Sequence, residues 1–139
     1  MDINYEIALA KEIAFEAHDG QFRKNGDPYI KHVSLVVSKV KDDKGAQVVA
    51  WLHDVLEDSG WTEKDLLKKG VSKEHVSIVL ILTKKREQRY EDYIKNVSKS
   101  SIATRVKIAD IISNLSDNPG NKQIVKFSKA LIKLCSHNN

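Results

Sequence analysis

The chain has 139 residues, of which 41% are hydrophobic and 30% charged, a composition typical of one globular domain and not of a disordered chain. Its single cysteine, Cys135, excludes an intrachain disulfide and a cysteine-based zinc site. The first residues lack the apolar core of a signal peptide, and no apolar run is long enough to span a membrane. We therefore expect one soluble, cytoplasmic domain over residues 1–139.

The net charge of +4 comes from 23 Lys and Arg against 19 Asp and Glu. The excess lies in residues 81–107, which hold eight basic and three acidic side chains. A local positive field suits a phosphorylated small molecule or a nucleic acid, although a basic stretch is often only a solvated helix surface. No recognition-helix motif accompanies these charges, so the sequence does not favour a nucleic-acid-binding protein.

Apolar residues recur at helical spacing in the first half of the chain. The first predicted helix, over residues 3–18, is followed by a polar loop over 19–28 that contains two glycines and a proline. Predicted helices over 29–40 and 46–57 come next. The second of these is apolar on nearly all sides, which is typical of a buried helix.

The second half of the chain continues the same pattern. Thr62 and Asp65 form a capping-box pattern at the start of a short helix, which Gly70 ends. Ser72 begins the next helix, and His75 in its first turn is expected to be exposed. Further helices are predicted over residues 89–98, 102–115 and 122–136. The whole pattern predicts an all-α, single-domain bundle of six to eight helices.

Few polar residues interrupt the apolar helix predicted over 46–57. Before Glu57, only Gln47, His53 and Asp54 are polar in this segment. An isolated carboxylate is costly to bury, so Asp54 needs a partner such as a bound cation. The alternative is that Asp54 lies on a thin solvated face of the helix while His53 bonds a backbone carbonyl in the core.

Two other predicted helices carry residues of the same types. His32 lies in the first turn of the second helix, and Asp110 lies inside an apolar run of the helix over 102–115. Together with His53 and Asp54 they offer two imidazoles and two carboxylates. Such a mixed nitrogen and oxygen site suits Mn²⁺, Fe²⁺, Zn²⁺ or Co²⁺. A divalent ion acidifies a bound water, which becomes a nucleophile near neutral pH.

At these residues the sequence resembles the HD superfamily of metal-dependent phosphohydrolases, whose motif is H…HD…D. More narrowly, it resembles the RelA/SpoT-type hydrolase domain and the small alarmone hydrolases. The matching stretches are AFEAHDGQFRKNGDPYIKHV (14–33), AWLHDVLEDSGWTEKDL (50–66) and VKIADIISNL (106–115). The resemblance implies an HD-type helical bundle. It also implies a metal ion, usually Mn²⁺, held by the ligands His32, His53, Asp54 and Asp110.

The resemblance further implies roles for residues around the metal. Glu57 and Asp58 match an acidic pair that orients and activates the attacking water, and Glu57 lies one helical turn beyond His53. Arg23 and Lys24, in the loop before the second helix, match a pair that contacts the nucleotide. A guanidinium suits this role because it can stack on a base and bind phosphate with two donors.

Two more positions match residues of the family, and the role of a third position is ambiguous. Asn114 matches a residue that contacts the substrate sugar. Lys107 matches a family lysine, although an intrahelical ion pair with Asp110 is its simpler role. The sequence leaves open whether Tyr29 packs in the core or contacts a ligand. The implied activity is that of a Mn²⁺-dependent hydrolase that removes pyrophosphate from the 3′ position of guanosine tetra- or pentaphosphate.

Two departures from the alarmone hydrolases leave the substrate open. Ser116 stands where those proteins typically have an arginine, and residues 81–84, Ile-Leu-Thr-Lys, replace their Gly-Val-Thr-Lys. One alternative is an HD phosphohydrolase that acts on a different nucleotide or phosphate ester. Another is a non-catalytic domain that binds a nucleotide, which the complete set of ligands and acidic residues does not favour. The sequence makes no prediction about the oligomeric state.

Overall fold

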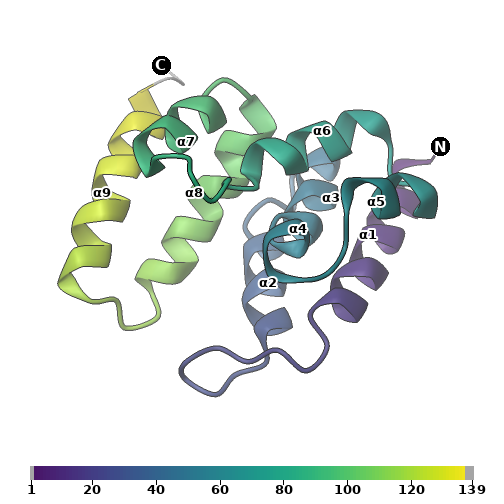
Figure 1. Cartoon of the computed structure of the whole chain (residues 1–139), viewed down its shortest axis with the longest axis horizontal. Helices are drawn as coiled ribbons and strands as arrows, with labels where there is room; N and C mark the ends of the chain where they lie inside the picture. The colour runs from purple at the N-terminus through teal and green to yellow at the C-terminus, as the bar shows by residue number, and fades with distance from the viewer. Residues whose placement is uncertain (1, 137–139) are drawn as a thin grey trace.

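A computed structural model describes residues 2–136, which form α-helices and no β-strand (Figure 1). The all-α prediction is therefore confirmed. None of the described helices is both long and apolar enough to cross a membrane. In chain order the nine helices of this part are α1 (Ile3–Ala17), α2 (Tyr29–Ser38), α3 (Lys44–Leu52), α4 (Val55–Asp58), α5 (Glu63–Lys69), α6 (Lys73–Leu82), α7 (Tyr90–Val97), α8 (Ser101–Leu115) and α9 (Asn121–Ser136).

Helix α3 lies at the centre of the packing, as its apolar sequence predicts. It contacts α1, α2, α6 and α8. Five of its side chains are fully removed from solvent, at 0% exposure: Ala46, Val48, Val49, Ala50 and Leu52. Burial on all sides keeps the C-terminal end of this helix in a fixed position.

The predicted helix over 46–57 is interrupted, which is a correction to the sequence analysis. Helix α3 ends at Leu52 and the single turn α4 begins at Val55, so His53 and Asp54 lie between two helices. The imidazole of His53 bonds the carbonyl oxygen of Ala50 through Nδ1, at 2.6 Å. In a continuous helix that oxygen would accept from the N–H of Asp54. The side chain thus competes with the backbone ladder and favours the break.

The loop between α1 and α2, at the bottom of Figure 1, is held by backbone hydrogen bonds. The N–H of Arg23 donates to the carbonyl of Asp27 at 2.8 Å, and the N–H of Tyr29 donates to Gln21 at 2.8 Å. Gly26 turns the chain with a φ of 91°, which a residue with a Cβ rarely adopts. These bonds give the loop a defined shape and so fix the direction in which Arg23 leaves the backbone.

Helices α7, α8 and α9 form one side of the molecule, at the left of Figure 1. Helix α9 contacts α7 and α8, and α8 reaches back to contact α2, α3 and α6. Helix α8 therefore connects the two sides, and it places residues from the C-terminal half of the chain beside the break between α3 and α4.

His75 is buried, with 7% exposure, and not exposed as the sequence analysis expects. Its Nδ1 lies 3.0 Å from Oε2 of Glu6 on α1. The same carboxylate oxygen accepts from the backbone N–H of Ser72 at 2.9 Å. The first turn of α6 is thus covered by α1, because Glu6 supplies the charge partner that allows an imidazole to be buried there.

Candidate metal centre

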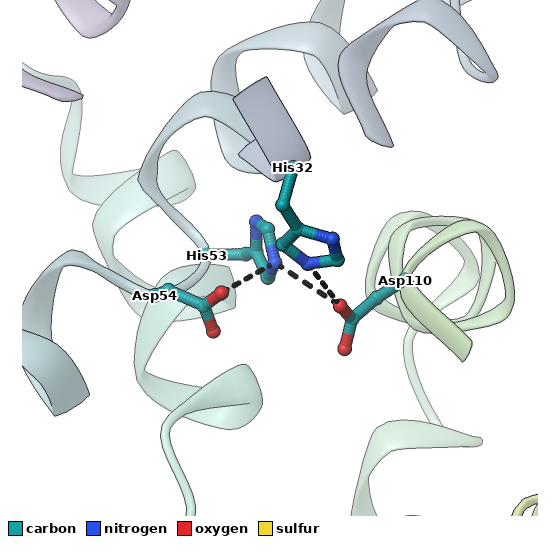
Figure 2. A group of neighbouring side chains, drawn as sticks. All are labelled: His32, His53, Asp54 and Asp110. Atoms are coloured by element: carbon teal, nitrogen blue, oxygen red, sulfur yellow. Dashed lines mark hydrogen bonds and ion pairs between the residues drawn. The ribbon is translucent and has the colours of Figure 1, made fainter. Parts of the chain in front are cut away.

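Four side chains from separate parts of the fold point toward one another (Figure 2). His32 comes from α2, His53 and Asp54 come from the break between α3 and α4, and Asp110 comes from α8. One ligand atom from each of the four lies within 4.8 Å of the others. The structure therefore brings together the four predicted metal ligands, while their binding of an ion stays a prediction.

Distances within this cluster are short. His32 Nε2 lies 2.9 Å from Oδ1 of Asp110. His53 Nε2 lies 3.0 Å from Oδ2 of Asp54 and 3.6 Å from Oδ1 of Asp110. Opposite ligands of a divalent transition metal lie about 4.2 Å apart, since each bond is about 2.1 Å long. The four side chains would thus fit around one ion after only small shifts.

The orientation of His53 also fits a metal ligand. Since its Nδ1 is bonded to the carbonyl of Ala50, the proton of a neutral ring lies on Nδ1 and the lone pair lies on Nε2. The Nε2 atom is buried and has no hydrogen-bond partner in the part of the chain that the structure describes. A bound cation would satisfy this nitrogen, and the core bond to Ala50 is compatible with that role.

The electrostatics of the cluster favour a positive charge between the carboxylates. Burial lowers the pKa of His53, but the carboxylates of Asp54 and Asp110 raise it well above its ordinary value. Burial raises the pKa of Asp110, but Lys107 and the two imidazoles hold it well below its ordinary value. A proton and a metal ion would therefore compete for the same place on Nε2 of His53.

Tyr29 and Lys107 support the two carboxylates. The hydroxyl of Tyr29 donates to Oδ2 of Asp54 at 2.5 Å. Lys107 Nζ lies 3.1 Å from Oδ2 of Asp110, which is the expected intrahelical ion pair. Sequence reasoning left the role of Tyr29 open. The only signal for its contact was its position one helical turn before His32, on the same face of α2.

Glu57 and Asp58 lie beside the cluster on the single turn α4. Burial raises the pKa of Glu57, and so do the charges of Asp54 and Asp58, although the backbone N–H of Lys84 donates to Glu57 and opposes this. Burial and the charge of Asp54 likewise raise the pKa of Asp58. Both carboxylates are consequently better proton acceptors than exposed ones at neutral pH.

Arg23 and Asn114 are joined to the cluster through hydrogen bonds. Arg23 Nη2 donates to Oδ1 of Asn114 at 3.0 Å, and Arg23 Nε lies 3.2 Å from Oδ2 of Asp117. The amide of Asn114 donates to Oδ1 of Asp110 at 3.4 Å. Lys24 is exposed on the same loop. The guanidinium is thus held by two partners, whereas Lys24 extends into solvent.

A cavity of about 870 Å³ connects nearly all of these side chains. Its lining includes eight of the nine predicted site residues: Arg23, Lys24, His32, Asp54, Glu57, Asp58, Asp110 and Asn114. The ninth, His53, lines an adjoining smaller cavity together with Asp54 and Glu57. The predicted residues therefore share one connected region, while their individual roles stay predictions.

The helical fold and the H…HD…D cluster resemble those of the HD-type RelA/SpoT hydrolase domain, and known proteins confirm this resemblance. Guanosine-3′,5′-bis(diphosphate) 3′-pyrophosphohydrolase of Haemophilus influenzae is 37% identical over 115 residues, which are 78% of this chain and 17% of that protein. The protein of the same name from Borreliella burgdorferi is 34% identical over 128 residues, 87% of this chain and 19% of that one. The chain thus spans less than a fifth of these relatives.

A solved structure has the same fold over nearly the whole chain. It is a metazoan ortholog of SpoT that hydrolyzes ppGpp, and it superposes with a TM-score of 0.77 at 24% sequence identity. The match covers 95% of this chain and 84% of that one. No established family profile matches the sequence.

Proposed function

We propose that this chain is a divalent-metal-dependent phosphohydrolase that removes pyrophosphate from the 3′ position of guanosine 3′,5′-bis(diphosphate). The observation that carries the proposal is the convergence of His32, His53, Asp54 and Asp110, with one imidazole nitrogen unpartnered, beside a cavity that holds acidic and basic side chains. The names of the relatives supply the substrate. Mn²⁺ is the proposed ion because it is the usual metal of the family that the sequence resembles, and the mixed nitrogen and oxygen donors are compatible with it. The expected cytoplasmic location stays a prediction.

The four cluster residues would hold the ion, which when bound would polarise a phosphoryl oxygen and acidify a water. Lys107 offsets part of the negative charge through its contact with Asp110. Tyr29 fixes one oxygen of Asp54 by donating to it. These contacts orient the carboxylates before a substrate arrives, so less reorganisation is needed during the reaction.

Glu57 and Asp58 would orient the attacking water and take its proton. Their raised pKa values suit this role, because a proton acceptor is most effective when its pKa is close to the working pH. In the reaction, the water oxygen forms a bond to the phosphorus attached to O3′, and the bond from that phosphorus to O3′ breaks. The O3′ atom then takes up a proton, and pyrophosphate leaves.

Arg23, Lys24 and Asn114 would bind the nucleotide. Arg23 is held by Asn114 and Asp117, so its planar group offers a rigid surface at the rim of the cavity. Lys24 is exposed and suits a mobile phosphate contact. Asn114 has hydrogen bonds to both Arg23 and Asp110, which places an amide between the nucleotide-binding loop and the metal cluster.

The test is pyrophosphate release from guanosine 3′,5′-bis(diphosphate) by the purified chain with Mn²⁺. We expect His53→Ala and Asp54→Ala each to lower kcat by at least about 1000-fold, because each removes a ligand of the ion. His75→Gln, at a buried histidine outside the cluster, serves as the matched control and should keep activity. Retained activity in both cluster variants would overturn the mechanism.

A nucleotide panel separates the remaining alternatives. It contains nucleoside triphosphates, NADPH and 3′-phosphorylated nucleosides besides the proposed substrate. Faster turnover of one of these would identify it as the substrate in place of guanosine 3′,5′-bis(diphosphate) and would leave the proposed hydrolytic mechanism unchanged. Tight nucleotide binding with no product over hours would instead support the non-catalytic domain.

A further inference from the structure

A second, smaller cavity of about 200 Å³ adjoins the metal cluster. His53, Asp54 and Glu57 line one part of it. The end of α6, the segment before α7, and helices α7, α8 and α9 supply the rest. The lining includes three lysines, Lys84, Lys107 and Lys126, and the side chain of Tyr90. Tyr90 and Lys126 lie outside the stretches that resemble the HD superfamily.

The lysines of this cavity carry more positive charge than the nearby contacts neutralise. Lys107 is paired with Asp110, at 3.1 Å. Among the residues that the structure describes, Lys84 Nζ bonds only a backbone oxygen, that of Lys85, at 3.2 Å. Lys126 Nζ has no carboxylate partner within the described residues, and it lies 4.1 Å from the centre of the Tyr90 ring. Two ammonium groups are therefore available to an anion.

The pKa of Lys126 reflects the same crowding of positive charge. Burial lowers it, and the charges of Lys107 and Lys84 lower it further. An anion placed among the three ammonium groups would remove this repulsion. The contact with the aromatic face orients Lys126 without neutralising it, since the ring carries no net charge.

The hydroxyl of Tyr90 is a second, independent observation. It is buried, and it has no hydrogen-bond partner among the described residues. Buried polar atoms are nearly always paired, so an orphaned hydroxyl that borders a cavity indicates a missing partner. A phosphoryl oxygen is a suitable partner because it accepts from hydroxyl and ammonium donors alike.

We propose that Lys84, Tyr90 and Lys126 form a subsite for a phosphoryl group of the substrate other than the one whose phosphorus is attacked. This proposal rests on the proposed function, because the metal cluster next to the cavity places the reacting phosphoryl group. The lysines in the lining favour an anionic phosphoryl group over an uncharged nucleobase. The subsite therefore favours nucleotides that carry at least two phosphoryl groups. The bound group is either the outer one of the 3′-diphosphate or one attached to O5′.

Lys126→Met tests the subsite, and Lys129→Met is the matched control. Lys129 lies on the same helix, and it does not line the smaller cavity. Loss of one charge-assisted hydrogen bond corresponds to about a 10- to 100-fold change in affinity. We expect Lys126→Met to raise KM for guanosine 3′,5′-bis(diphosphate) by about this factor, with a smaller effect on kcat. Equal KM values for the two variants would overturn the proposal.

A second substrate distinguishes the two sources of the phosphoryl group. Guanosine 3′-diphosphate with a free 5′ hydroxyl has only the 3′ group. If Lys126→Met raises KM for both substrates, the subsite holds the outer phosphoryl group of the 3′-diphosphate. If it raises KM only for the substrate with 5′ phosphates, the subsite holds one of these. Both results support the subsite.

Tyr90→Phe keeps the ring under Lys126 and removes only the hydroxyl. We expect about a 3- to 10-fold rise in KM, less than in Lys126→Met, because a neutral donor contributes less than a charged one. An unchanged KM would remove Tyr90 from the subsite. Far-UV circular dichroism and thermal unfolding check that each variant is folded.

Direct binding of inorganic pyrophosphate separates this proposal from the proposed function. Calorimetry with Mn²⁺ present compares the wild-type chain, Lys126→Met and Lys129→Met. Suppose that the wild type hydrolyses no nucleotide, and that Lys126→Met binds pyrophosphate about 10-fold more weakly than the wild type and Lys129→Met do. This result would support the subsite and contradict the proposed function. If nucleotides are hydrolysed, and Lys126→Met matches Lys129→Met both in KM and in pyrophosphate binding, only the subsite proposal is contradicted.

Discussion

Two buried groups of histidine and carboxylate lie in different parts of this molecule. The candidate metal-binding cluster of His32, His53, Asp54 and Asp110, called the metal cluster below, combines residues of α2, α8 and the break between α3 and α4. The Glu6–His75 pair joins α1 to α6. Both contain a short contact of 3.0 Å or less between an imidazole nitrogen and a carboxylate oxygen. Residue type and burial alone therefore do not distinguish a site from a structural contact.

The difference lies in how completely each group is satisfied. In the Glu6–His75 pair, the carboxylate also accepts from the N–H of Ser72, and the described structure leaves none of the buried side-chain atoms of these three residues unpartnered. In the metal cluster, Nε2 of His53 faces two carboxylates without a hydrogen bond. The pair is complete in the folded chain, whereas the cluster leaves one buried nitrogen open to a further cation.

Adding Mn²⁺ should give the largest difference between the metal cluster and the Glu6–His75 pair, measured as a change in thermal stability. Mn²⁺ at about 100 times its dissociation constant stabilises the protein that binds it by about 2.7 kcal/mol, a rise in Tm of roughly 10 °C for a chain of this size. We expect this rise in the wild-type chain and in Glu6→Gln, but not in Asp54→Ala. Differential scanning calorimetry measures it. A rise of equal size in Asp54→Ala would show that the ion binds elsewhere.

The sequence predicts more of the helices than of the contacts between them. The capping box of Thr62 and Asp65 and the left-handed Gly70 are found as predicted, because caps depend on neighbours in sequence. The break after Leu52 was not predicted, since the apolar pattern continues through it. A hydrogen bond of the His53 side chain favours that break, and this bond has no signature in hydrophobic periodicity.

In the candidate site, too, the sequence predicts features that depend on neighbouring residues and misses those that depend on residues far away in the chain. The four residues of the cluster could be selected from the sequence because polar residues stand out in apolar helices, and the structure brings them together. The burial of His75 was missed because its partner, Glu6, is 69 residues away. The orphaned hydroxyl of Tyr90 was missed as well, because a missing partner is visible only after the surrounding helices are packed. Tertiary contacts, and not propensities, decide these features.

His75→Ala should break the structural pair and leave the metal cluster intact. The carboxylate of Glu6 would stay buried with only the N–H of Ser72 as a partner. We expect a loss of about 2–3 kcal/mol in the free energy of unfolding, measured in urea, because a buried charge without its partner is destabilising. The double variant Glu6→Gln, His75→Ala should lose less than the sum of the two single changes. A loss below about 0.5 kcal/mol, typical of a surface substitution, would contradict the structural role.

The smallest expected effect is a dependence of the free energy of unfolding on pH that arises from the carboxylate of Glu6. Burial raises the pKa of Glu6, but the hydrogen bonds from His75 and Ser72 outweigh it and lower the pKa in the folded chain. The folded state therefore binds protons less readily than the unfolded one. Its extra stability is present above the unfolded pKa, at about pH 4.3, and is lost as the pH falls through the folded pKa.

Glu6→Gln isolates this contribution, because all other carboxylates are shared with the wild-type chain and their effects cancel in the difference. The stability difference between the two proteins should be largest near pH 6 and should shrink as the pH falls below about 4. Urea unfolding over this range measures it, with EDTA present so that metal binding does not contribute. A difference that stays constant with pH would mean that Glu6 acts through packing alone. The Glu6–His75 pair would then stabilise the fold without a contribution from charge. It would differ from the metal cluster only in having no unpartnered nitrogen like Nε2 of His53 among the described residues.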